Sequence, residues 1–231
     1  MKKISFLCFF FFFMGLSLAS PVKSIIAARL SECSSDNRKL PEGIVEVQYI
    51  YTEDRKPFIN TIYADTDMSF EMGFLNSTQK AMAFGSLLGT TSRFCFPASS
   101  SDFFYFGGKD NVRMASSVMT LNTYHDVSMS KNGIYVDGTL LPSSISSAQY
   151  IQSTILLSLN GWNYNGRNES RGAMRIYYFR AWKGGVRILD LIAVRFLNEK
   201  GEWEGAMYDW VSGELFRNSG TGSFLIGPDK E

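Results

Sequence analysis

The chain has 231 residues, of which 45% are hydrophobic and 15% aromatic, and its formal net charge is +1 at pH 7. This length allows one β-sandwich or barrel with a well-buried core. The balanced charge argues against nucleic acid as a partner, because such proteins carry a basic face. The chain has a single histidine, which limits the catalytic and zinc chemistry open to it.

The first 19 residues have the three parts of a secretory signal peptide. Lys2 and Lys3 precede an apolar run from Ile4 to Leu18, and small residues follow it. A retained membrane anchor is the less favoured alternative, because a bilayer-spanning helix needs about 20 apolar residues. We expect cleavage after Ala19. The product would have no transmembrane span and would be secreted, extracellular or at the cell surface, with the periplasm as a further option.

Residues 20–42 form an N-terminal lead-in, for which a short helix and a loop are expected, and residues 43–231 form a single domain. Within this domain apolar residues alternate with polar ones or glycine, as from Met68 to Phe74. That period is typical of a strand with one face in a core. The run Phe103–Phe106 is also strand-like, and core packing is its default interpretation.

Glycine-containing turns separate these segments. Asn132-Gly133 predicts a type I′ hairpin, and Asp137-Gly138 predicts a second turn directly after it. Further glycines follow Met174–Trp182 and Arg187–Phe196. Short strands with such turns indicate an all-β sandwich or barrel rather than alternating strands and helices.

The C-terminal segment carries a more specific pattern. It combines Tyr208-Asp209 with an Asn-x-Gly-Thr-Gly-x-Phe tail from Asn218 to Phe224, and then Gly227-Pro228. This ending resembles that of secreted bacterial laminin-G-like domains of the concanavalin A-like lectin and glucanase superfamily, and the resemblance extends over roughly Glu46 to Asp229. It implies an all-β, two-sheet antiparallel jelly-roll sandwich. Function does not follow, because the superfamily includes lectins, glucanases and adhesion modules.

The sequence contains no catalytic pattern of this superfamily. The glucanases place their carboxylates in a Glu-x-Asp-x-Glu run, which is absent here, and Glu199, Glu202 and Glu204 flank Gly201 in an expected turn. There is no Gly-x-Ser-x-Gly elbow, and His125 is better explained as a structural side chain. We therefore expect a non-catalytic module that binds a glycan or a surface protein. A glycoside hydrolase of the same fold and a structural surface-assembly protein remain as alternatives.

The segment between Asn160 and Arg167 is the predicted ligand site. It has the glycines and asparagines of a loop but also carries Trp162 and Tyr164. Aromatic rings can stack on sugars while amides and a guanidinium bond to the hydroxyls. The predicted polar contacts are Asn160, Asn163, Asn165 and Arg167. In the alternative interpretation the aromatics cover a sheet edge and the asparagines only stabilise turns.

Two further sites are weaker hypotheses. Asp65 and Asp67 lie in an expected turn, and calcium is a candidate there, although it takes about six to eight oxygen ligands and turns favour aspartate in any case. No other cofactor is expected. In an oxidising compartment Cys33 and Cys95 could form a disulfide, and two separate thiols fit the sequence equally well.

Overall fold

The computed structural model describes residues 39–53, 56–79, 81–88, 92–98, 103–107, 111–113, 118–142, 152–164, 167–169 and 171–231. All of these except Lys39 belong to one unit, Leu40–Glu231. The predicted signal peptide and the lead-in before Lys39 lie outside the described residues. No helix in the described part of the chain is long and apolar enough to cross a membrane.

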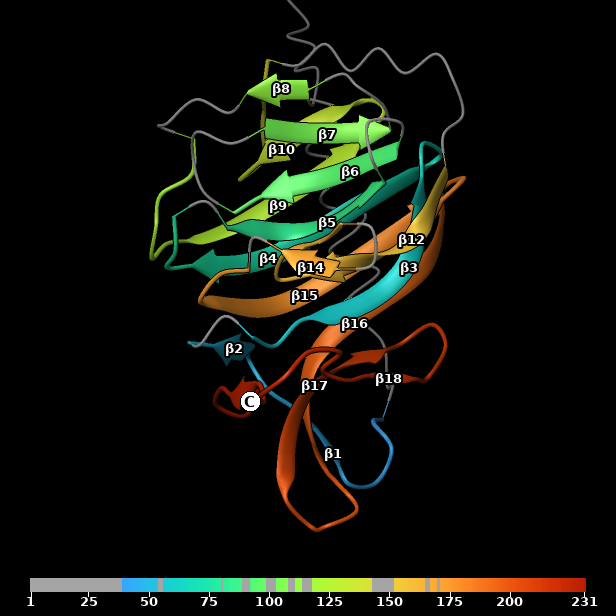
Figure 1. The fold of residues 1–231 in the computed structure, drawn as a ribbon. Coiled ribbons are helices and arrows are strands. Elements are labelled where there is room, and N and C mark those ends of the chain that lie inside the picture. The colour runs from blue at the N-terminus through green and yellow to red at the C-terminus, as the bar shows by residue number, and fades with distance from the viewer. Residues whose placement is uncertain are drawn as a thin grey trace, which may run out of the picture. The chain divides into compact units, whose positions relative to one another are not determined.

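The unit is an all-β sandwich of two sheets, as the alternating pattern predicted (Figure 1). The larger sheet has its main strands in the spatial order β11 (Thr139–Leu140), β10 (Gly133–Val136), β9 (Tyr124–Ser130), β4 (Met68–Asn76), β15 (Met174–Lys183), β16 (Val186–Leu197), β17 (Trp203–Asp209) and β18 (Leu215–Phe216). Three short strands add to it, namely β1 (Ile44–Glu46) on β16, β2 (Ile50–Thr52) on β15, and β19 (Leu225–Ile226) on β2.

The smaller sheet has the order β14 (Arg167–Glu169), β13 (Trp162–Tyr164), β5 (Met82–Leu88), β6 (Ser92–Pro97), β7 (Phe103–Gly107) and β8 (Asn111–Arg113). In the same sheet β12 (Gln152–Leu159) pairs with β3 (Ile59–Asp65) and with β5. The described pairings are antiparallel except that of β13 with β5, which is parallel.

Phenylalanine fills the space between the two sheets. Phe70 and Phe179 from the larger sheet meet Phe84 from the smaller sheet, with ring centroids 5.4 to 6.2 Å apart. Phe104 and Phe106 are also buried, which confirms core packing for these two residues of the Phe103–Phe106 run. The alternation from Met68 to Phe74 is confirmed as well, because its apolar side chains all lie in this core.

The apolar strand β16 is buried on both of its faces. Leu189 and Leu191 belong to the main core, whereas Ile192 and Val194 belong to a second cluster on the other side of the larger sheet. Partly buried residues from the start of the unit and from β18 pack against that second cluster. This double burial explains why β16 reads as nearly continuous apolar sequence rather than as an alternating strand.

The first predicted hairpin turn is displaced by one residue. Gly133 pairs with Ser130, so the turn is Lys131-Asn132 and the prediction of a type I′ turn at Asn132-Gly133 was wrong. Gly133 instead lies in β10, where an added Cβ would be 2.7 Å from Cδ1 of Leu140. The second predicted turn is confirmed, and Asp137 and Gly138 have the positive φ angles (50° and 77°) of a type I′ turn.

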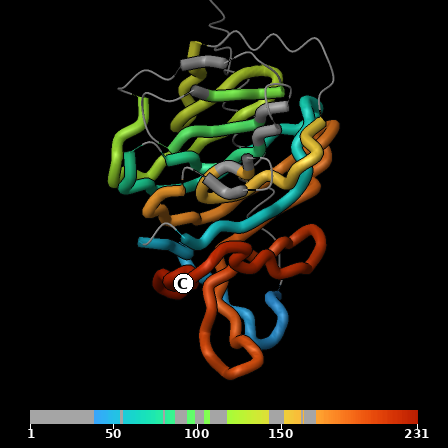
Figure 2. The backbone as a smooth tube through the Cα atoms, in the orientation of Figure 1, coloured from blue at the N-terminus to red at the C-terminus, as the bar shows by residue number. Residues whose placement is uncertain are grey.

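The distinctive C-terminal tail docks on the start of β3. Asn218 Oδ1 accepts hydrogen bonds from the backbone of Phe58 and Gly220, and Ser219 Oγ accepts one from Asn60. A Cβ at Gly220 would collide with the carbonyl oxygen of Lys56, so this position needs glycine. Figure 2 shows the end of the chain beside the segment that contains β1 and β2. The tail pattern is therefore a structural anchor.

Candidate functional site

Five of the tyrosines that the structure describes gather on the face of the larger sheet that is turned away from the main core. We call them the tyrosine cluster: Tyr49, Tyr51, Tyr124, Tyr177 and Tyr178. They come from β2 and the residue before it, from β9 and from β15. Neighbouring rings meet edge to face, with centroids 4.9 to 5.8 Å apart. Such a group presents apolar rings and hydroxyl groups on one surface.

A β-bulge in β15 places two consecutive tyrosines on this surface. The register with β4 shifts between Ile176 and Tyr178, and Tyr177 is the extra residue. Ile176 and Phe179, on either side of the pair, are both fully buried. In a regular strand one of two consecutive side chains points into the core, whereas a bulge re-aims a side chain.

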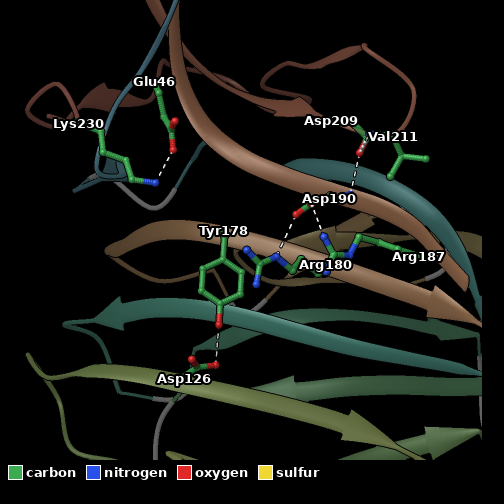
Figure 3. Close-up of polar contacts among 9 residues, drawn as sticks. All are labelled: Glu46, Asp126, Tyr178, Arg180, Arg187, Asp190, Asp209, Val211 and Lys230. Atoms are coloured by element: carbon green, nitrogen blue, oxygen red, sulfur yellow. Dashed lines mark hydrogen bonds and ion pairs between the residues drawn. The ribbon is translucent and has the colours of Figure 1, made fainter. Parts of the chain in front are cut away.

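Gly73 of β4 provides the space that the cluster needs. It pairs with Tyr178 on one side and with Asp126 on the other. Figure 3 shows the Tyr178 ring lying across the strand between these two residues. A Cβ at Gly73 would lie 2.6 Å from Cε1 of Tyr178 and 2.7 Å from the hydroxyl oxygen of Tyr124. Any larger residue would therefore displace both tyrosines.

Asp126 ties the cluster to β9. The Tyr178 hydroxyl donates a 2.6 Å hydrogen bond to Asp126 Oδ1. Partial burial of the Asp126 carboxyl group raises its pKa, an effect that the Tyr178 hydrogen bond opposes. Burial and the nearby Asp126 charge raise the pKa of Tyr124 to about 12 and raise that of Tyr178 as well. Both phenols therefore remain protonated hydrogen-bond donors over the physiological pH range.

A row of charged and aromatic side chains continues from the cluster along β15 and β16. Arg180 Nε lies 2.9 Å and Arg187 Nη1 2.8 Å from the two carboxylate oxygens of Asp190, which is nearly buried (Figure 3). The two guanidinium groups also lie over aromatic rings, Arg180 over Tyr178 at 4.6 Å and Arg187 over Trp182 at 5.4 Å. The ion pairs thus hold the aromatic side chains in a defined arrangement.

The segment predicted as the ligand loop is partly a hairpin of the smaller sheet. Trp162–Tyr164 forms β13 and Arg167–Glu169 forms β14, so the prediction of a loop was wrong there. Asn160 and Gly161, both with positive φ, turn the chain after β12, and β13 then pairs alongside β5. The side chains of Trp162, Tyr164 and Arg167 lie outside the described part of the structure, as does all of Asn165.

The two described asparagines of this segment are buried. Asn160 Nδ2 donates to the carbonyl oxygen of Pro57 at 2.8 Å, and Asn160 Oδ1 accepts from the Gly172 amide at 3.0 Å. Asn163 is 9% exposed. Asn160 thus links the end of β12 to the residues before β3 and before β15. A ligand role for residues 160–167 remains a prediction.

The calcium candidates face cations of the chain itself. The Asp65 carboxylate is fully buried and lies 2.7 Å from Lys183 Nζ. It also accepts a hydrogen bond from the backbone amide of Asp67. The exposed Asp67 lies 3.9 Å from Lys131 Nζ. Among the described residues, no group of three or more histidine, cysteine or acidic side chains is placed to hold a metal ion. Calcium at Asp65 would have to displace the lysine.

The two remaining candidates, Cys95 and His125, have buried side chains. Cys95 is buried, with Sγ 3.7 Å from the carbonyl oxygen of Ser86, and Cys33 lies outside the described residues. The disulfide therefore stays a prediction. His125 is 5% exposed, with Nδ1 2.8 Å from Asp137 and Nε2 3.1 Å from the backbone of Thr120. These contacts are those of a packed, hydrogen-bonded side chain.

Sequence analysis did not identify the tyrosine cluster. Two local signals indicated it, namely the isolated Gly73 within an alternating strand and the adjacent pair Tyr177-Tyr178. A glycine in such a place suggests a close approach by another group. The partners of that approach come from β9 and β15, which are distant in sequence, so only the sheet order could reveal them.

Comparisons of this chain with protein-family models, with curated proteins and with solved structures found no match.

Proposed function

We propose that this chain is a secreted or cell-surface, non-catalytic module of laminin-G-like jelly-roll type, and that it binds carbohydrate through the tyrosine cluster. One observation carries the proposal: five tyrosines lie together on one sheet face, and Tyr124 among them is 43% exposed. Tyrosine offers a rigid apolar ring for the C–H face of a sugar and a hydroxyl for its polar edge.

The charges on the same face support a binding role rather than hydrolysis. Glycoside hydrolysis needs two carboxyl groups that are available to the scissile bond. Asp190 is nearly buried and ion-paired with two arginines. Asp126 accepts a hydrogen bond from the Tyr178 hydroxyl. Such pairs suit the positioning of aromatic side chains.

A glycan array with the secreted protein, followed by titration of the best hit, tests the proposal. Tyr124→Ala should weaken binding by about tenfold or more, because truncation of an interface aromatic commonly costs about 1–3 kcal/mol. Tyr63→Ala is the matched control, since Tyr63 is 50% exposed but lies on β3 of the smaller sheet. The proposal fails if no glycan binds, if both variants lose binding equally, or if bound sugar is hydrolysed.

A further inference from the structure

Arg175 lies at the border of the tyrosine cluster and is exposed. It is part of β15, where it pairs with Tyr51 of β2. Its guanidinium carbon lies 4.7 Å from the ring centroid of Tyr49, and that ring meets Tyr177 at 5.3 Å. The stacking holds a positive charge directly beside the rings proposed to bind a ligand.

Arg175 differs in its charged partners from the arginines further along the same face. Arg180 and Arg187 are both ion-paired with Asp190. Arg175, in contrast, has no ion pair with any residue in the described ranges. Stacking uses the flat face of a guanidinium and leaves the N–H groups at its edge, whose fork geometry matches a carboxylate.

We infer that the ligand is an acidic carbohydrate with uronic-acid carboxylates, and that Arg175 binds one of these carboxylates. This inference rests on the proposed function, because it names the class of carbohydrate. A uronic acid complements the site at three points: its ring C–H groups meet tyrosine rings, its hydroxyls meet phenols and Asp126, and its carboxylate meets Arg175. A neutral sugar would use only the first two.

Calorimetric titration of the secreted protein with paired probes tests this inference. The probes are hexasaccharides containing galacturonate, glucuronate or mannuronate, each beside its carboxyl-reduced form. The protein should bind at least one acidic probe about tenfold more tightly than the reduced form, as expected for one charge-assisted bidentate contact. Arg175→Gln should abolish this preference, so that the variant binds the acidic and the reduced form with equal affinity. Tyr124→Ala should weaken both forms.

Arg217 offers a matched control. It is also exposed and also stacked, 4.5 Å from the ring centroid of Phe196, but it lies outside the tyrosine cluster. Arg217→Gln should keep the preference, and equal losses from both arginine variants would overturn the inference by indicating nonspecific attraction.

The other outcomes separate this inference from the proposed function. Equal binding of acidic and reduced forms, or a preference that survives Arg175→Gln, overturns the inference and leaves the carbohydrate module in place. Failure of every sugar on the panel and the array overturns both. Binding of an oligoglutamate peptide that depends on Arg175, without any sugar binding, would overturn both in favour of an acidic protein partner.

Discussion

Replacement of Gly73 by alanine tests how the tyrosine cluster is built. The new Cβ would lie 2.6 Å from Cε1 of Tyr178 and 2.7 Å from the hydroxyl oxygen of Tyr124. Such atoms normally approach to about 3.5–4.0 Å, so each side chain must move by about 1 Å. Tyr178 cannot do so freely, because its hydroxyl is held 2.6 Å from Asp126.

The expected loss of stability follows from three contributions. Overpacking at a formed site costs about 1–3 kcal/mol. Stretching the hydrogen bond from Tyr178 to the charged Asp126 adds to this cost. The addition is limited, because Asp126 is exposed. Alanine is more favourable than glycine in a strand by roughly 0.5–1 kcal/mol, which offsets part of this loss. We expect Gly73→Ala to lower the free energy of unfolding by about 1–2 kcal/mol and to weaken ligand binding.

Urea denaturation in a double-mutant cycle measures this effect. In the Tyr178→Ala background most of the steric conflict is gone, so Gly73→Ala should cost at least about 1 kcal/mol less than in the parent protein. Equal losses in the two backgrounds would refute the reasoning, because the cost would then come from the backbone of β4 and not from the tyrosine ring.

Three further predictions concern stability. Ser86→Ala should raise the free energy of unfolding by about 1 kcal/mol in urea denaturation, because the buried Ser86 hydroxyl has no hydrogen-bond partner among the residues that the structure describes. Ser158→Ala should lower it by a similar amount, because it removes the 2.6 Å hydrogen bond to Asn60. A loss of stability at Ser86 would contradict this reasoning. Asp190→Asn should lower the free energy of unfolding by at least about 2 kcal/mol in the same assay, because it leaves two partly buried arginines without their carboxylate. An unchanged free energy of unfolding would mean that these ion pairs do not stabilise the fold. The pKa of Tyr124 is raised from 10.0 to about 12, so in this pH range the folded state retains a proton that the unfolded state loses. The free energy of unfolding should therefore fall between pH 10 and pH 12. Tyr124→Phe should reduce that fall in a parallel denaturation series.

A turn could be predicted from the sequence only where it depends on the backbone conformation of its own residues. Asp137-Gly138 needs positive φ at both positions, a local requirement that the residue types meet. Asn132-Gly133 has the same residue pattern, but there Gly133, with a φ of 144°, lies in β10 rather than in the turn. Its place is set by the pairing of β10 with β9, and the two residues by themselves do not show that.

The strands with one face in a core could be predicted from the sequence, because side-chain alternation and turn residues are properties of neighbours along the chain. The residues from Met68 to Phe74 show this directly. The tyrosine cluster, in contrast, could not be predicted, because it depends on how distant strands pair. Tyr124 and Tyr178 are far apart in sequence and meet because β9 and β15 both pair with β4, where Gly73 leaves room for them. Sheet order and a bulge set that contact, and both result from the packing of the whole sandwich rather than from any local pattern.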